Sequence, residues 1–304
     1  MKKIAYGLFA AIAFASPGLA QNAAAPLNPA VEQVRGSTQA LSSETRADLR
    51  MISEDRGEVV ELNGRPRRSP RFRLGASTSI EHQSNAPLLP SGPRDDWTST
   101  SFFDAGWNPA LSESLSFDLS LRSEITGYFH LDQLSYWGPM TSALFDFHPR
   151  ANWPHAYAGG QLYRYDRIRS GAEITSAGAV LAGLEQSWDF HSGRTRLSMG
   201  YQFANYWAFP LSEDRMTHTL FAAITQQLAG SLYAQGSYTW QYTAFENQAR
   251  YDSRHNIALA LLYALNDRTA LRLYMNFVRN ESSAPPADYE NFSSGLGVSF
   301  SAHF

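Results

Sequence analysis

Apolar and polar residues alternate along most of the chain from residue 72 onward. In the segment 115–126, leucine, phenylalanine and isoleucine hold most odd positions, whereas polar and charged residues hold the even ones. A period of two is the pattern of a β-strand with two unlike faces, because successive side chains point to opposite sides. The pattern predicts strands at 71–81, 97–107, 115–126, 137–147, 156–167, 180–189, 196–207, 220–228, 232–242, 257–265, 268–277 and 293–304.

The stretches between these strands alternate in length and character. One set is tight, and the other is longer and more polar, although its member at 168–173 is short. Antiparallel strands can be joined by tight turns, so we expect strands paired in chain order, with turns at one end of the sheet and loops at the other. The tight set lies at 108–113, 148–154, 191–194, 229–230 and 266–267, and the longer set at 85–96, 129–136, 210–215, 245–254 and 280–289.

Two β architectures fit this alternation: a soluble sandwich or lipocalin-like barrel with an apolar core, and a barrel whose apolar face meets lipid. Strands of about ten residues span a bilayer when tilted, and an even number of strands with alternating turns and loops is typical of bacterial outer-membrane barrels. Trp107, Trp188, Trp207 and Trp240 fall near strand ends on the apolar face, where interfacial girdles form. We therefore predict an all-β fold, a closed antiparallel up-and-down transmembrane β-barrel of about twelve strands.

Composition narrows the classes of function. The chain has 304 residues, no cysteine, a net charge of −3 and 13% aromatic residues. Without cysteine it has no disulfide, no thiolate metal site and no thiol nucleophile. A net charge so near zero gives no reason to expect nucleic acid as a partner. Neither a metal-ligand spacing nor a phosphate-binding glycine loop is present in the sequence, so we predict no metal and no cofactor.

The first part of the chain differs from the strand region. Lys2 and Lys3 precede an apolar stretch at 4–15, and Pro17 and Ala20 follow it in the pattern of a cleaved secretory signal peptide. The segment 21–70 lacks the alternation and is rich first in alanine, proline and glutamine and later in arginine. The expected organisation is a signal peptide at 1–20, a flexible or weakly helical periplasmic segment at 21–70, and the barrel at 71–304.

The end of the chain carries a more specific pattern. Leu296, Val298 and Phe300 share one face of the last predicted strand, and the chain ends on Phe304. This tail resembles the β-signal of Gram-negative outer-membrane proteins. The resemblance implies an outer-membrane location, membrane lipids as a partner, and recognition by the barrel-assembly machinery during insertion. In its wider rhythm the segment 72–304 resembles β-barrel porins and the barrel halves of export-associated outer-membrane proteins.

Charged residues on the polar faces are the first candidate functional set. In a barrel these faces line the interior, which predicts a porin-like channel or export-associated barrel that passes polar solutes or a polymer such as a polysaccharide. The alternative is a paired interior network in a structural or surface-recognition barrel with a closed lumen. The predicted lumen-lining residues are Arg73, Glu81, Asp104, Asp118, Arg122, Glu124, Glu185, Asp189, Arg196 and Arg272.

A second alternative is an enzyme. The stretch from His82 to Asn85 resembles the H-x-S-N segment of outer-membrane phospholipase A and lipid A deacylase. His82 and Ser84 are two residues apart and share the lipid face, so a histidine base and a serine nucleophile would make a lipid esterase if a third group oriented the imidazole. Asp95 and Glu290, at neighbouring loop ends, are the candidates for that group. We expect a channel first and this esterase second, with turn hydrogen bonds as the non-catalytic reading of the same residues.

Overall fold

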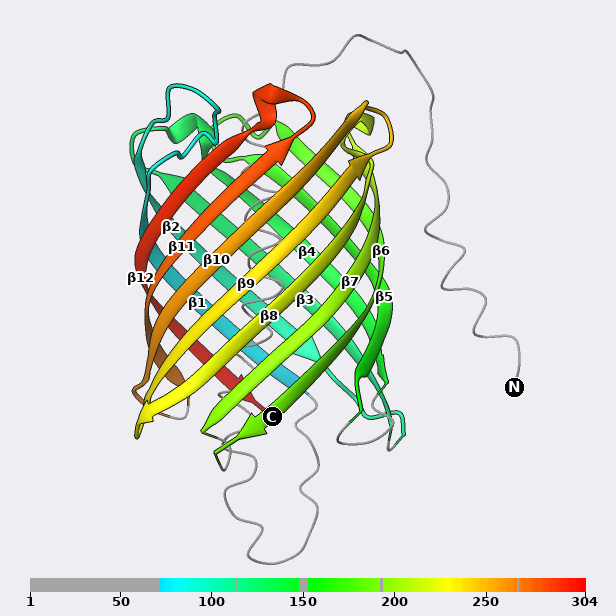
Figure 1. Cartoon of the computed structure of the whole chain (residues 1–304), viewed down its shortest axis with the longest axis vertical. Helices are drawn as coiled ribbons and strands as arrows, with labels where there is room; N and C mark the ends of the chain where they lie inside the picture. Colours follow the sequence, from blue (N-terminus) through cyan, green and yellow to red (C-terminus); the bar gives the residue numbers. More distant parts are fainter. Residues whose placement is uncertain (1–71, 113, 148–152, 192–193, 267) are drawn as a thin grey trace, which may run out of the picture.

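The computed structural model describes residues 72–112, 114–147, 153–191, 194–266 and 268–304. The signal peptide, the segment 21–70 and Arg71 lie outside the described residues, so those predictions are left as they stand. The rest of the chain forms twelve strands, which tilt around a common axis (Figure 1). They are β1 (Phe72–Gln83), β2 (Asp96–Trp107), β3 (Leu115–Tyr128), β4 (Tyr136–Phe147), β5 (His155–Arg167), β6 (Glu173–Phe190), β7 (Thr195–Phe209), β8 (Arg215–Ala229), β9 (Leu232–Phe245), β10 (Arg250–Ala264), β11 (Thr269–Ser282) and β12 (Tyr289–His303).

Each strand pairs antiparallel with its neighbours in chain order, and β12 returns to β1 to close the barrel. The predicted fold class and strand number are thereby confirmed. Closure matters because a sheet edge in hydrocarbon would leave backbone N–H and C=O groups without partners. In the described part of the chain, each of the helices is too short and insufficiently apolar to cross a membrane.

The two faces of the wall have opposite character. Large apolar side chains such as Leu74, Leu121 and Leu259 are about half exposed on the outer face. Their neighbours in sequence point inward and are mainly polar, charged or small. A wall that is apolar outside and polar inside fits lipid around it and water within it. The period of two therefore arises from two different solvents on the two faces.

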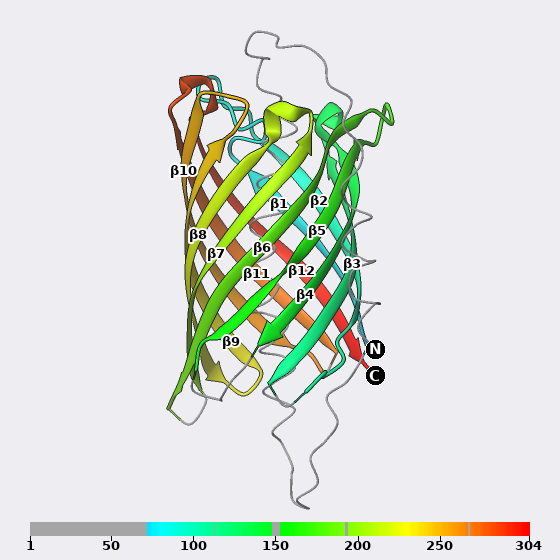
Figure 2. The same ribbon diagram turned by 90° about the vertical axis from the view of Figure 1, so that its right-hand side faces the viewer.

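The two ends of the barrel also differ. The C-terminus lies at the end with the tight turns, which we call the turn end (Figure 1). The opposite end, which we call the loop end, carries three short 3-10 helices: η2 (Asp132–Leu134), η3 (Leu211–Glu213) and η4 (Pro285–Ala287) (Figure 2). Trp107 and Trp188 lie toward the turn end, whereas Trp207 and Trp240 lie toward the loop end.

Several strands extend further toward the loop end than the sequence pattern predicts. The expected loop at 245–254 is wrong in extent, because β9 continues to Phe245 and β10 begins at Arg250. The same holds for β6, β8 and β11, which reach into residues expected to be connections. These extensions carry polar residues on both faces, as in Ser253, Arg254 and His255, so a contrast of apolar and polar positions does not reveal them.

The contact between β1 and β12 closes the barrel. Its register runs from Arg73 opposite His303 to Gln83 opposite Ser293. At the turn end the Phe72 N–H donates to the Phe304 carbonyl at 3.2 Å, and the Phe304 N–H donates to the Phe72 carbonyl at 2.9 Å. The last residue of the chain is thus hydrogen-bonded into the wall rather than frayed.

Candidate functional site

The interior of the barrel holds the charged residues that the sequence singled out. Every one of the predicted lumen-lining residues occupies an inward position, opposite the exposed apolar positions of its own strand. These residues therefore face inward, as expected from the sequence. Their role in selecting a solute stays a prediction.

Two of these charges form ion pairs with other predicted residues. The Arg73 guanidinium on β1 donates to the Asp118 carboxylate on β3 at 2.9 Å. Near the turn end, Arg196 on β7 donates to Asp189 on β6 at 2.8 Å. Pairs of this kind hold the charged side chains against the inner face of the wall.

A tyrosine-rich cluster lies around Glu124 on the inner face of β3 to β5. The Glu124 side chain is 3% exposed and accepts hydrogen bonds from the hydroxyls of Tyr136 at 2.8 Å and Tyr165 at 3.3 Å. The ring of Tyr163 lies beside that of Tyr165 at an angle of 57°, with the centroids 5.7 Å apart. The three rings belong to a buried cluster on the inner side of the wall.

Arg122 sits next to this cluster in a different setting. Its guanidinium lies over the ring of Phe102 at 4.1 Å from the centroid, a cation–π contact. In the strand register Arg122 is directly opposite Asp104. A cation stacked on a ring keeps its N–H groups pointed along the surface, where a solute with acceptor oxygens can meet them.

The inward arginines that open β8 and β10 escaped the sequence prediction, as did Arg254 further along β10. Arg215 on β8 donates to the Tyr163 hydroxyl at 3.0 Å and lies 4.3 Å from the centroid of the Tyr206 ring. Arg250 on β10 pairs with Asp252 two residues further on. Both arginines open strands whose beginnings were assigned to loops. Extending the alternation of 220–228 and 257–265 toward the loop end would have placed both on the inner face.

The remaining predicted lumen residues have partners of other kinds. Glu81 accepts hydrogen bonds from the Tyr274 hydroxyl at 2.9 Å and the Gln83 amide at 2.6 Å. Arg272 lies 5.2 Å from the centroid of the Tyr274 ring. Glu185 lies opposite His155 in the register of β5 and β6. The interior is thus lined by charges of both signs, spread over most of the wall.

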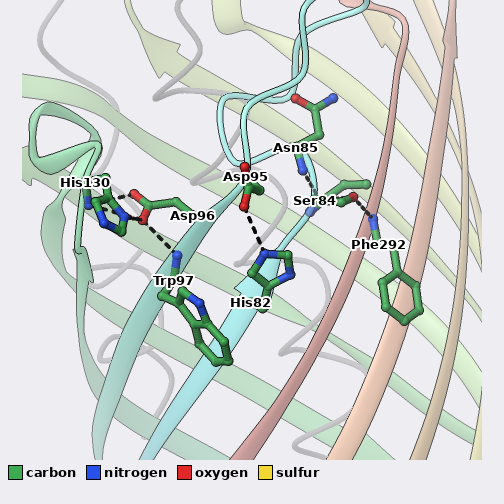
Figure 3. A network of polar contacts seen from close by, with 9 residues as sticks. His82, Ser84, Asn85, Asp95, Asp96, Trp97, His130 and Phe292 are labelled. Atoms are coloured by element: carbon green, nitrogen blue, oxygen red, sulfur yellow. Dashed lines mark hydrogen bonds and ion pairs between the residues drawn. The ribbon is translucent and has the colours of Figure 1, made fainter.

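The structure separates the two residues of the predicted esterase (Figure 3). The His82 imidazole lies 3.3 Å from the carboxylate of Asp95, which is one of the two residues expected to orient the imidazole. Ser84 instead faces β12, where its Oγ accepts the Phe292 N–H at 2.9 Å and donates to Asn291 at 3.4 Å. Among the described residues, no hydrogen bond joins His82 to Ser84.

Neighbouring contacts show what this corner does instead. The Asn85 side chain donates to the carbonyls of Leu89 and Glu290, and so ties the β1–β2 loop to β12. Asp96 is 2% exposed and accepts N–H groups from His130 and Leu131, which ties β2 to the loop before β4 (Figure 3). The hydrogen-bonding pattern matches the turn interpretation, because polar side chains here satisfy loop backbone.

The described residues contain no group of three or more His, Asp or Glu side chains that could hold a metal ion. A further set of polar side chains lies on the outer face of β7 to β10, including His218 and His255. Sequence reasoning missed this set because the predicted strands at 220–228 and 257–265 stopped short of both histidines.

Comparisons with known proteins place the chain among outer-membrane barrels. Residues 212–302, from η3 through most of β12, match the model of a family described as "Putative beta-barrel porin 2". No curated protein sequence matches the chain. An outer membrane channel from Pseudomonas putida F1 superposes with a TM-score of 0.53 at 8% identity, covering 80% of this chain and 100% of its own.

Two other solved barrels are similar in outline. The β domain of the Bordetella autotransporter BrkA has a TM-score of 0.47 at 10% identity and covers 77% of this chain and 100% of its own. LpxR from Salmonella typhimurium has a TM-score of 0.42 at 8% identity and covers 75% of this chain and 99% of its own. At such identities, likeness to the Pseudomonas channel shows the fold alone. Together with the family match it confirms the predicted resemblance to outer-membrane, porin-like barrels.

Proposed function

We propose that this β-barrel, which resembles outer-membrane porins, forms a channel for small polar solutes through a lumen lined by arginines and carboxylates. The loop end then faces the outside of the cell and the turn end faces the periplasm, as is usual for such barrels. Export of a polymer is the variant of this proposal in which the same lumen serves a longer substrate.

The observation that carries the proposal is the exposure of charged side chains on the inner face. Arg73 is 34% exposed, and Arg196 and Asp189 are 25% and 49% exposed, although all three point away from the lipid side. Burying a charged group away from water costs far more than burying an apolar one. Charges that stay partly exposed inside a closed barrel therefore fit a water-filled lumen better than a dry, packed interior.

The tyrosine cluster on β3 to β5 gives the proposed channel its narrow region. Tyr136 and Tyr165 are buried, and their hydroxyl groups donate to Glu124 and hold its carboxylate in place. Arg122 lies on the neighbouring inward position of the same strand as Glu124. A cation fixed at this position suits solutes that carry carboxylate or hydroxyl oxygens.

Planar bilayer recordings test the channel directly. We expect stepwise currents from the full-length protein, and we expect Arg122→Ala to shift the ratio of anion to cation permeability toward cations by roughly two- to fivefold. That range follows because a unit charge about 4 Å from an ion in water contributes about 1 kcal/mol. Asp104→Asn should shift the ratio in the opposite direction. Leu121→Ala, on the outer face of the same strand, is the matched control and should leave the ratio unchanged.

The competing interpretation is a barrel whose lumen is closed. A folded protein that inserts into the bilayer but gives no current steps, in the wild type and all three variants alike, would support that interpretation and end the channel proposal. Current steps with an unaltered ion preference in Arg122→Ala would show that this arginine does not line the conducting path.

A further inference from the structure

A group of polar side chains interrupts the apolar outer face where β9 meets β10. Ser253 and His255 are two residues apart on β10 and share the outward face with Ile257 and Leu259. Tyr238 and Trp240 on β9 share the same face, and Trp240 is directly opposite His255 in the register. Trp240, Ser253 and His255 lie in the half of the barrel nearer the loop end, and Tyr238 lies near the middle of β9. A polar side chain that faces lipid away from the interface costs free energy, so a group of such residues suggests a function.

The four side chains form one connected hydrogen-bonding array. The Ser253 Oγ lies 3.5 Å from the His255 Nε2. The other ring nitrogen of His255, Nδ1, lies 2.8 Å from the Tyr238 hydroxyl oxygen. The Trp240 indole N–H donates to the Ser253 Oγ at 3.0 Å. A serine next to a histidine whose far nitrogen is held by a third group is the arrangement of an activated nucleophile.

From this geometry we propose that Ser253, His255 and Tyr238 form a catalytic site for hydrolysis of acyl esters of lipids in the surrounding leaflet. The proposal goes beyond the channel function and is independent of it, because the site is on the outer face of the wall. Trp240 satisfies one lone pair of the serine oxygen, which leaves the Ser253 O–H free to donate to His255.

The reaction uses water as its second substrate. The Ser253 Oγ attacks the carbonyl carbon of a lipid ester while the His255 Nε2 takes the hydroxyl proton, with the Nδ1–H donating to the Tyr238 oxygen. The tetrahedral intermediate collapses, the bond from carbon to the alcohol oxygen breaks, and the alcohol leaves with the proton from His255. Water then attacks the acyl-serine, gives its proton to His255, and releases the fatty acid as Ser253 recovers its proton.

The surroundings fit an amphiphilic ester rather than a dissolved one. The array opens toward lipid, and Tyr238 is 43% exposed on that face. On β11, Arg279 is directly opposite His255 and also points outward, where it pairs with Glu281 at 2.9 Å and lies 3.7 Å from Glu290. Charges of both signs at this level suit the head group of a zwitterionic phospholipid, whose acyl chains would lie along the apolar wall below.

The same barrel wall supplies a matched control. His218 on β8 also points outward and its Nδ1 lies 2.7 Å from the Tyr201 hydroxyl oxygen. The residue two positions before it is Met216 rather than a serine, so this histidine–tyrosine pair has no hydroxyl at the position that corresponds to Ser253. His218→Ala therefore removes an equivalent outward pair without touching the proposed site.

The test measures release of fatty acid from phospholipid vesicles that contain the folded full-length protein. We expect Ser253→Ala and His255→Ala each to lower the rate about 10³-fold or more, down to the rate of vesicles without protein. His218→Ala should keep the wild-type rate. Tyr238 is a positioning residue, and we expect Tyr238→Phe to lower kcat about tenfold while KM stays the same. A fluorophosphonate probe should label the wild type at Ser253, and mass spectrometry of the labelled peptide gives the position.

Release of fatty acid at equal rates from the wild type and Ser253→Ala, or equal probe labelling of both, would overturn the proposal. Loss of heat-modifiable mobility in a variant would expose a folding defect. The conservative Ser253→Thr, which retains a hydroxyl, and the labelling experiment then decide the question without relying on that variant. We expect Ser253→Ala to have the same conductance as the wild type. The channel proposal and the hydrolase proposal are therefore tested independently of each other.

Discussion

At the scale of single residues, Gly159 on β5 shows how little space the inner wall leaves. A Cβ built on it would overlap the backbone carbonyl oxygen of Ala143 and contact Leu144 at 2.9 Å. The obstacle is backbone, which cannot rotate away as a flexible side chain can. Gly160, the next residue, points to the other face, where an added Cβ would meet the nearest atom at 3.4 Å, an ordinary contact.

We therefore expect Gly159→Ala to destabilise the barrel by about 1–3 kcal/mol, the usual cost of overpacking, and Gly160→Ala to leave stability nearly unchanged. Urea titration of the refolded proteins in vesicles measures the difference. Equal midpoints for the two variants would mean that β4 and β5 can move apart without cost, contrary to the contacts described.

The residue scale also separates what alternation can and cannot reveal about the site. Parity gives the face of each side chain, so the inward position of Arg73 and Asp118 follows from the sequence. Their contact does not, because it spans from β1 to β3 and depends on how far each strand is staggered. The same limit explains Ser84: its face is predictable, but its contact with Phe292 depends on the register of β1 against β12.

At the scale of elements, β12 combines a structural and an assembly role. Phe304, the residue that follows β12, is hydrogen-bonded to Phe72 through the backbone, while the Phe304 side chain is 68% exposed. A side chain so exposed adds little packing to the wall. The predicted role of the Phe304 side chain is recognition by the barrel-assembly machinery during insertion, as the resemblance to the β-signal implies.

We expect Phe304→Ala to reduce the amount of folded barrel in the outer membrane of cells severalfold, while the purified variant refolds into detergent as well as the wild type. Heat-modifiable mobility on gels measures both. Phe72→Ala is the control, since it removes an exposed ring from the paired residue on β1. If the two variants assemble equally well in cells, the terminal aromatic is not a signal.

The central parts of the strands were predictable because lipid and lumen impose unlike chemistry on neighbouring positions. In β3, Leu119, Leu121 and Ile125 alternate with charged or polar residues, and the predicted segment lies within the observed strand. The loop-end parts of β8 and β10 were not predictable in this way. Arg215 and Ser253 lie where both faces carry polar residues, so the period disappears although the hydrogen-bonded ladder continues.

At the scale of the whole molecule, the outer wall should be sensitive to charge in proportion to depth. Leu259 lies near the middle of β10, and Tyr263 lies one residue before its turn end. Arginine at the bilayer midplane of a barrel costs about 2–4 kcal/mol, against about 0–1 kcal/mol near the interface. We expect Leu259→Arg and Tyr263→Arg to differ in this way in unfolding experiments on vesicles. Similar losses at both positions would contradict a lipid-facing wall.

The meeting of β1 and β12 has a consequence for how the molecule is made. Every other strand pair in the described chain joins consecutive strands, which can form as hairpins with little loss of chain entropy. Closing the cylinder instead requires the two extremes of the described chain to find each other. Synthesis delivers one of those partners last. A chain that still lacks β12 is therefore an open sheet with two unpaired edge strands. Such edges favour pairing with other chains over closure into a smaller barrel.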